Sequence, residues 1–229
     1  MPRVALVSSA EAREHDTDLP LITAALGSLG VGSDIIDWDT AAADWQQFDA
    51  AVVRSPWDYH RRYDEFLAWL DVVSAATRLF NDAGIIRWNT DKTYVAELVD
   101  AGVPVIPTTF IAGAQALVDA SDAGVLSADV VVKPTVSAGS NNTERHRSSQ
   151  VRAAAHVASL IDNGMTAMVQ PYQAGIDEHG ESGLLYFNGS YSHAFRKGAI
   201  LATGENVKNG LFTEEDISSR DAAPDELVV

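Results

Sequence analysis

The sequence predicts a mixed α/β and α+β fold, in which a parallel α/β domain precedes a second region that contains a β-hairpin. Apolar strand-like runs alternate with amphipathic helical patterns through residues 1–88, which indicates parallel strands with helices on their faces. Farther on, Asn188-Gly189 separates two alternating runs, the sequence that a two-residue type I′ turn requires. With 229 residues, of which 46% are hydrophobic and 21% charged, the chain can bury sizeable cores.

The N-terminal layer is predicted from short apolar runs and one clear helix stop. Its expected strands lie at 4–7, 33–36 and 50–53. A helix over 19–29 is closed by Gly30. A second helix presents one apolar face, formed by Tyr63, Phe66, Leu67 and Leu70.

The pattern changes at residue 89. A helix is expected to begin with Thr90 or Asp91 as its cap and to end at Gly102, burying Tyr94, Val95, Leu98 and Val99. The elements expected after it are strands at 105–110, 130–133 and 167–170, helices at 112–120 and 149–161, a small-residue loop at 137–143, and the hairpin. We expect three regions: 1–88, 89–197 and 198–229, the last a loop that closes with the first turn of a helix at 224–229.

Composition excludes several functions. A net charge of −16 would repel a phosphate backbone, so nucleic-acid binding is not expected. No apolar run approaches the roughly 20 residues that span a bilayer, so no membrane partner is expected either. The absence of cysteine removes disulfides, thiolate zinc sites and a cysteine nucleophile, and it suits a cytoplasmic protein.

Two lysines occupy unusual places. Lys92 lies in the first turn of its expected helix, where an ammonium is disfavoured unless an anion binds there; the alternative is a solvated lysine on the helix surface. Lys133 ends an apolar strand that Pro134 stops. Burying an unpaired ammonium is costly, so Lys133 either meets an anion or extends to water.

Further candidates follow the strands. The small side chains of Ser137, Ala138 and Gly139 leave backbone N–H groups that can surround a phosphate. Gln170 and Tyr172 flank a strand end whose backbone can hydrogen-bond adenine, the alternative being an ordinary strand end.

The hairpin ends in two cations. Counting outward from a two-residue turn sets Phe187 opposite Ser190, Leu184 opposite His193 and Glu181 opposite Arg196. Arg196 and Lys197 can then hold phosphates while the carboxylate restrains the guanidinium; the alternative is a surface ion pair.

In the N-terminal layer, Arg54 follows a strand, at the edge where parallel sheets bind ligands. Arg54 is therefore a candidate for binding a substrate carboxylate, and Ser55 and Asp58 are further candidates for substrate binding; the alternative is a packed loop anchored by Trp57. The histidines predict no metal site, because His146 and His156 lack a partner at ligand spacing and His179 is expected in an exposed turn.

Taken in order, several stretches resemble the ATP-grasp superfamily, specifically its glutathione-synthetase-like branch. They are Asn89-Thr90-Asp91-Lys92, Gly102-Val103-Pro104-Val105-Ile106-Pro107-Thr108, Val132-Lys133-Pro134, Ser137-Ala138-Gly139, Val169-Gln170-Pro171-Tyr172 and Ser192-His193-Ala194-Phe195-Arg196-Lys197. The resemblance implies a pre-ATP-grasp domain over 1–88 and an ATP-grasp clamp over 89–197. Within the branch, Arg54-Ser55-Pro56-Trp57-Asp58-Tyr59 and the run 193–197 look like the group that contains the cyclo-ligase of cycloserine biosynthesis.

The resemblance also implies roles. Lys92 and Lys133 would contact ATP phosphates, and Ser137, Ala138 and Gly139 would lie in the loop that closes over them. Gln170 and Tyr172 would sit at the adenine. Glu178 or Glu181 would reach the ribose or stabilise Arg196, which with Lys197 would face the transferred phosphate. The implied activity is an ADP-forming ligase, in which ATP converts a small-molecule carboxylate into an acyl phosphate and an amine-type nucleophile displaces phosphate.

One departure from the family limits this expectation. Family members carry acidic residues near the C-terminus, often a Glu-x-Asn triplet, that bind two Mg²⁺ ions, and no such triplet follows Lys197. We therefore expect a fragment truncated at its C-terminus, without the magnesium ligands and inactive as given. The alternatives are a non-catalytic nucleotide-binding or scaffold protein and an unrelated α/β protein. The sequence identifies neither substrate, and it leaves a homo-oligomer open, because related ligases are often dimers or tetramers.

Overall fold

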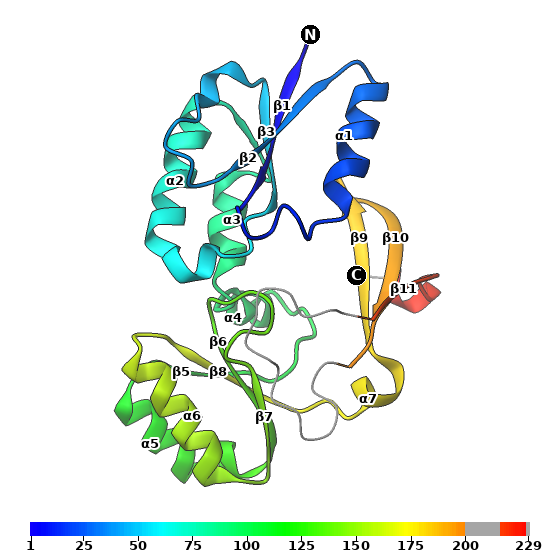
Figure 1. Cartoon of the computed structure of the whole chain (residues 1–229). Coiled ribbons are helices and arrows are strands. Elements are labelled where there is room, and N and C mark those ends of the chain that lie inside the picture. The colour runs from blue at the N-terminus through cyan, green and yellow to red at the C-terminus, as the bar shows by residue number, and fades with distance from the viewer. Residues whose placement is uncertain (200–215, 228–229) are drawn as a thin grey trace. The chain divides into compact units, whose positions relative to one another are not determined.

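The computed structural model describes residues 1–199 and 216–227 (Figure 1). They fall into two compact units. The first unit contains Met1–Val105 and Pro134–Asn141, and the second contains Ile106–Lys133 together with the described residues from Asn142 onward. Each unit has a core of its own. The domain limits expected from the sequence, 1–88, 89–197 and 198–229, stay a prediction.

The first unit is built on a four-stranded parallel sheet in the order β2-β1-β3-β4. Its strands are β1 (Arg3–Ser8), β2 (Gly32–Asp37), β3 (Ala50–Ser55) and β4 (Arg78–Phe80). The first three confirm the predicted strands. Sequence reasoning did not reveal β4 because its three residues are too few to show a period.

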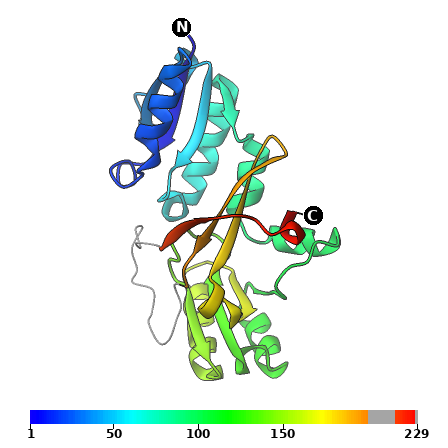
Figure 2. The ribbon, with the colours of Figure 1, turned by 90° about the vertical axis from the view of Figure 1, so that its right-hand side faces the viewer.

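Helices cover both faces of this sheet (Figures 1 and 2). The helical segments of the first unit are α1 (Asp18–Ser28), η1 (Trp45–Gln47), η2 (Tyr59–Arg62), α2 (Tyr63–Ala76), α3 (Ala83–Thr90) and α4 (Tyr94–Asp100). Beneath α2, Ala5 and Val7 of β1 join an aromatic core with Phe66 and Trp69. Gly30, at φ 72°, ends the α1 segment as predicted, because glycine adopts this conformation without steric cost.

The segment 90–102 differs from its prediction. It is not one helix: α3 ends at Thr90, and a turn follows in which the Asp91 carboxylate accepts a hydrogen bond from the Thr93 backbone N–H at 3.0 Å. No residue of α4 is buried, and Val99 is 55% exposed. The prediction that Tyr94, Val95, Leu98 and Val99 are buried is therefore wrong. A sequence can show that a helix has an apolar face, but it does not show whether another element packs against that face.

The second unit contains a four-stranded sheet in the order β5-β8-β6-β7. Its segments are β5 (Thr109–Ile111), α5 (Ala114–Asp122), η3 (Val125–Ser127), β6 (Asp129–Pro134, whose last residue clusters with the first unit), β7 (Glu144–Arg147), α6 (Gln150–Asp162) and β8 (Ala167–Pro171). Helices α5 and α6 pack against it through a buried aliphatic core that includes Leu126, Val132 and Val157. Strand β5 begins later than predicted, after Pro107, whose missing N–H cannot join a sheet ladder.

A helix and an antiparallel sheet follow. They comprise α7 (Gly175–His179), β9 (Glu181–Phe187), β10 (Ser190–Lys197), β11 (Ile217–Arg220) and the turn η4 (Pro224–Leu227). Strand β11 pairs with β10 where the sequence predicted a loop over 198–224 (Figure 2). Its four residues, mostly polar, carry no alternating pattern. The η4 turn confirms the helical start expected at 224, whereas 200–215 and 228–229 lie outside the described residues.

The hairpin turn is confirmed and its outer register is corrected. Asn188 and Gly189 both have positive φ, 50° and 77°, as a type I′ turn requires, and Phe187 faces Ser190. A bulge between Tyr191 and His193 then shifts the register by one residue.

Two predicted cross-strand pairs are therefore wrong. Glu181 faces Lys197, not Arg196, and His193 faces Leu185, not Leu184. A bulge adds an unpaired residue without leaving a mark in the alternating pattern.

Candidate functional site

Lys92 lies in the turn between α3 and α4, not inside the first turn of a helix as predicted. Its ammonium donates hydrogen bonds to the backbone oxygens of Ser137 and Thr135, at 3.0 and 3.2 Å, and to the Ser137 hydroxyl at 3.2 Å. The Lys92 backbone N–H also donates to Thr135, at 3.0 Å. Lys92 therefore fastens the start of the small-residue loop.

That loop, residues 134–141 after β6, has further anchors in the first unit. The Tyr59 hydroxyl donates to the Ser137 oxygen at 3.3 Å, and the side chains of Asn141 and His60 are hydrogen-bonded at 3.1 Å. Burial raises the pKa of Tyr59 to about 12 and lowers the pKa of His60, so the phenol stays protonated and the imidazole stays neutral near pH 7. Beyond Ser137 the chain takes positive φ at Gly139 and Ser140, 59° and 56°. Backbone of this kind can turn N–H groups toward one point.

Lys133 is half-buried near the end of β6 in the second unit. Burial lowers its pKa, and the carboxylate of Glu181 partly offsets that effect. Burial destabilises the charged form of the Lys133 ammonium, and a further anion beside it would stabilise that form. This lysine is therefore suited to binding a phosphate.

Arg196 of β10 is hydrogen-bonded to the backbone at the end of α7. Arg196 donates through Nε to the oxygen of His179 and through a terminal nitrogen to the oxygen of Glu178, the latter at 3.2 Å. The Glu178 carboxylate lies 3.8 Å from the His179 ring on the exposed surface. Arg196 is therefore held by backbone carbonyls rather than by the carboxylate that the sequence suggested.

Gly180 makes this corner possible. It has φ 71°, and a Cβ there would lie 2.4 Å from the backbone oxygen of Lys197 and 3.0 Å from Nε of Arg196. Both the conformation and the close approach require glycine.

Gln170 and Tyr172 lie at the end of β8. The Gln170 amide donates to the Thr108 hydroxyl at 2.9 Å, beside an open cavity of about 300 Å³. The cavity residues are Pro107, Thr108, Thr109, Ala123, Gly124, Val125, Ala128, Val130, Val169, Gln170 and Pro171. The backbone N–H of Tyr172 donates to the Asp129 oxygen at 2.9 Å.

Sequence reasoning missed an arginine at this strand end. Arg145 stacks on the Tyr172 ring, 3.2 Å from its centroid, and donates two hydrogen bonds to the Asp129 carboxylate, at 2.9 and 2.7 Å. The hydrogen bonds from Arg145 lower the pKa of Asp129, and the Asp129 carboxylate raises the pKa of the guanidinium. The residue went unnoticed because β7, which carries it, was not predicted.

In the first unit, the candidate substrate residues lie at the carboxyl end of β3 and in the loop that follows it, beside the end of β1. The Arg54 guanidinium is paired with the carboxylates of Asp16 and Asp18, and the buried Ser55 hydroxyl lies 2.9 Å from that of Ser8. Asp16 is 5% exposed, and its Oδ2 has no hydrogen-bond partner among the residues that the structure describes. Since Arg54 already faces two carboxylates, this group suits a substrate amine better than the substrate carboxylate that the sequence suggested.

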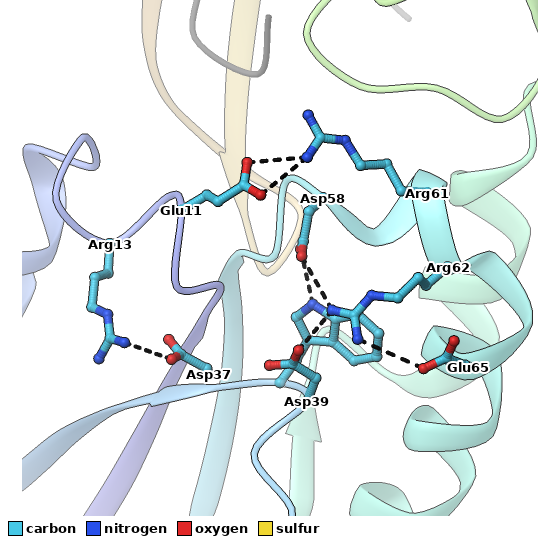
Figure 3. Close-up of polar contacts among 9 residues, drawn as sticks. Glu11, Arg13, Asp37, Asp39, Asp58, Arg61, Arg62 and Glu65 are labelled. Atoms are coloured by element: carbon cyan, nitrogen blue, oxygen red, sulfur yellow. Dashed lines mark hydrogen bonds and ion pairs between the residues drawn. The ribbon is translucent and has the colours of Figure 1, made fainter.

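Asp58 belongs to a polar network across the loops that follow β1, β2 and β3 (Figure 3). It accepts hydrogen bonds from the Trp38 indole at 2.9 Å and from Arg62 at 3.4 Å. Arg62 also pairs with Asp39 at 2.6 Å and lies over the Trp38 ring, and its pKa is raised chiefly by the hydrogen bond to Asp39. Sequence reasoning did not reveal the contacts of Arg62 with Asp39 and Trp38, because these two partners come from the separate loop after β2, whereas Asp58 lies only four residues before Arg62.

Two more ion pairs join these loops. Arg13 pairs with Asp37 at 2.7 Å and Arg61 with Glu11 at 3.1 Å (Figure 3). Burial raises the pKa of Asp37, with Arg13 opposing that shift. The edge where parallel sheets bind ligands is thus lined by mutually neutralised charges.

The positions of His146 and His156 differ from the prediction that they have no partner. Nε2 of His146 lies 3.1 Å from Nδ1 of His156, and Glu144 lies beside them, so the expectation that these histidines have no partner is wrong. Burial lowers the pKa of both rings. The third histidine, His179, is exposed at the end of α7, as predicted.

Among the described residues, no helix combines the length and apolar character that crossing a membrane demands.

Comparison with known proteins identifies the family. A family model described as the N-terminal domain of D-cycloserine synthetase DcsG matches residues 4–81. The cycloserine biosynthesis protein DcsG of Streptomyces lavendulae is 39% identical over 99% of this chain and 77% of its own length. The crystal structure of D-cycloserine synthetase DcsG superposes with a TM-score of 0.88 at 38% identity, covering 98% of this chain and 77% of that chain.

A more distant structure has the same fold. It is the ATP-grasp ligase PsnB complexed with a phosphomimetic variant of its minimal precursor, Mg and ADP, with a TM-score of 0.59 at 14% identity, covering 98% of this chain and 78% of that chain. The chain has the fold of the ATP-grasp ligases and belongs to the DcsG family.

Proposed function

We propose that this chain uses ATP to phosphorylate a small-molecule carboxylate and then joins the acyl group to an amine-type nucleophile. A carboxylate oxygen attacks the γ-phosphorus, and the bond to the β-phosphate oxygen breaks to release ADP. The nucleophile's lone pair then attacks the acyl carbon, the carbon–oxygen bond to phosphate breaks, and the nucleophile loses a proton. The observation that carries the proposal is Lys133, a cation whose burial makes an arriving phosphate favourable.

We assign nucleotide roles to residues within each unit separately. Lys133 binds ATP phosphate, and Lys92 holds the 137–139 loop in place for the same purpose. Backbone N–H groups of Ser137, Ala138 and Gly139 bind phosphate oxygens. Gln170 and Tyr172 contact adenine, with the Tyr172 ring fixed by Arg145.

The hairpin end supplies the charge for transfer. Arg196, oriented by the oxygens of Glu178 and His179, faces the transferred phosphoryl group together with Lys197. Glu181 lies opposite Lys197 and offers an acceptor for the ribose. Fixed cations of this kind stabilise charge that develops in the transition state.

We assign substrate binding to Arg54, Ser55 and Asp58. Arg54 pairs with Asp16 and Asp18, and the exposed Asp18 carboxylate accepts a hydrogen bond from a substrate amine. Asp58, fixed by the Trp38 indole, orients the loop after β3. The 39% identity with a cycloserine biosynthesis protein favours a cyclisation, in which carboxylate and nucleophile belong to one molecule.

An ATP-grasp relative was solved with Mg and ADP bound, and we assign no magnesium ligand among the described residues. Mg²⁺ prefers six oxygen ligands, whereas the group of potential metal ligands found among the described residues contains two imidazoles.

Calorimetric titration of ATP into the wild type and into Lys133→Ala, with and without Mg²⁺, tests the proposal. We expect the variant to bind ATP about tenfold more weakly or worse, because a half-buried charge-assisted contact to phosphate is lost. Arg147→Ala removes an exposed cation from β7, the same change in net charge, and it should bind like the wild type.

Folding of each variant is checked by circular dichroism. Equal ATP affinity in wild type and Lys133→Ala would refute the assignment of this lysine. Capture of an acyl phosphate, when candidate amino carboxylates and hydroxylamine as a trap are supplied, would exclude a non-catalytic nucleotide-binding protein, whereas binding without turnover is also the result expected of a ligase that lacks its magnesium ligands. The relationship to a biosynthetic ligase does not favour that alternative.

A further inference from the structure

Three side chains that bind transition metals converge on one edge of the second unit. Glu144 and His146 are two residues apart on β7, so they point to the same face of the strand. His156 extends from α6, which packs against β7. Strand β7 is at the edge of its sheet, next to β6.

The spacing of the ligand atoms fits a shared ion. Nε2 of His146 and Nδ1 of His156 are 3.1 Å apart, and Oε2 of Glu144 lies 3.8 Å from Nε2 of His146. Two nitrogens bound tetrahedrally to zinc at about 2.0–2.1 Å are about 3.3 Å apart. The two imidazoles therefore already stand at nearly the separation that an ion between them requires.

The surroundings support these ligands. The His146 side chain is only 6% exposed, whereas that of Glu144 is 40% exposed, so the group is buried on one side and reachable from solvent on the other. His156 also has a hydrogen bond to the backbone of Asn142. A backbone bond of this kind fixes the orientation of histidines that ligate metals.

We infer that Glu144, His146 and His156 bind one Zn²⁺ ion, which fastens the edge strand β7 to α6. Two histidines and one carboxylate suit zinc, with water as the fourth ligand. The two nitrogens make the group unsuited to Mg²⁺, so this site is distinct from the ATP chemistry.

One neighbouring side chain carries a positive charge and would repel a bound zinc ion. Arg152, exposed on α6, acts electrostatically on His146. Its removal should therefore strengthen zinc binding, which gives the proposal a second, opposite test.

The experiment is a Zn²⁺ titration of the full chain, free of affinity tags, in competition with a chromophoric chelator. We expect one site in the wild type, at least tenfold weaker binding in His156→Gln and Glu144→Gln, and tighter binding in Arg152→Gln. His179→Gln, which removes an exposed histidine on α7, should match the wild type. Co²⁺ in place of Zn²⁺ should give the intense visible bands of a four-coordinate site.

Stability supplies the second measurement. Zn²⁺ should raise the melting temperature of the wild type and of His179→Gln but not that of His156→Gln. Absence of a stoichiometric site, or equal zinc affinity in His156→Gln and His179→Gln, would overturn the inference and leave a hydrogen-bonded histidine pair. Glu144→Gln keeps the test valid if a histidine variant fails to fold, because its side chain is partly exposed.

Discussion

At the scale of single residues, Gly180 decides how the cations of β10 are presented. Its backbone turns at φ 71° between α7 and β9, and the oxygen of Lys197 and Nε of Arg196 occupy the space where a Cβ would lie. A side chain here would therefore push against the segment that we assign to phosphoryl transfer.

We predict that Gly180→Ala lowers the free energy of unfolding by more than Gly189→Ala does. Gly189 has φ 77°, and no atom lies within 4 Å of the place where its Cβ would be, so its substitution costs only the left-handed strain, about 1–2 kcal/mol. Gly180→Ala adds the clash with Lys197. Chemical denaturation of both variants measures the difference, and equal losses would show that the corner relaxes freely.

The contact between Asp129 and Arg145 has a pH signature. Because the pKa of Asp129 is lowered in the folded protein, its contribution to stability is present at neutral pH and is lost as the pH falls through the folded pKa. We predict that Asp129→Asn melts at a lower temperature than the wild type at pH 7. The gap should close below about pH 4, where the wild-type carboxyl is increasingly protonated.

Thermal melts between pH 3 and pH 7 measure the difference in melting temperature between the wild type and Asp129→Asn. Asp162→Asn, at the exposed end of α6, serves as the control and should not reproduce it. A gap that persists unchanged at pH 3 would mean that the carboxylate charge does not matter to the contact.

At the scale of elements, α2 links the aromatic core to the small-residue loop. Phe66 is 1% exposed, stacks on Trp69 and contacts Tyr59, and Tyr59 donates to the loop oxygen of Ser137. Packing under α2 therefore positions a side chain that holds the loop.

We predict that Phe66→Ala lowers the free energy of unfolding by about 3–5 kcal/mol, because it removes a fully buried aromatic side chain. Val72→Ala on the same helix should change it by no more than about 0.5 kcal/mol, since Val72 is 60% exposed. Urea denaturation compares the two. A similar small loss in both variants would show that the core refills the cavity.

Some elements could be predicted from the sequence and others could not, depending on whether they carry a local signal. Strands β1 to β3 and helices α1 and α2 follow from hydrophobic period and a glycine stop, which are local signals. Strand β7, with the sequence Glu-Arg-His-Arg, offers no apolar period, and it is recognised only by its pairing with β6. Because β7 was missed, the meeting of His146 with His156 was missed with it.

At the scale of the whole molecule, the family could be expected from the order of short motifs, and a relative matched over 99% of the chain bears it out. The contacts of individual charged side chains could not be predicted from the sequence. From its place near a helix start, Lys92 was expected either to meet an anion or to be solvated on the helix surface, yet its ammonium donates to carbonyl oxygens 43 and 45 residues away. Which of many polar atoms meets a given lysine depends on how distant segments fold together, and no local pattern encodes that.

The path of the chain also limits how this protein can be dissected. Residues 134–141 cluster with the first unit although the strands that flank them, β6 and β7, lie almost wholly in the second. An expression fragment ending at residue 105 would therefore delete the segment on which the Lys92 ammonium and the Tyr59 hydroxyl rest. Domain swaps with relatives should exchange residues 134–141 together with 1–105, as two stretches of one cassette.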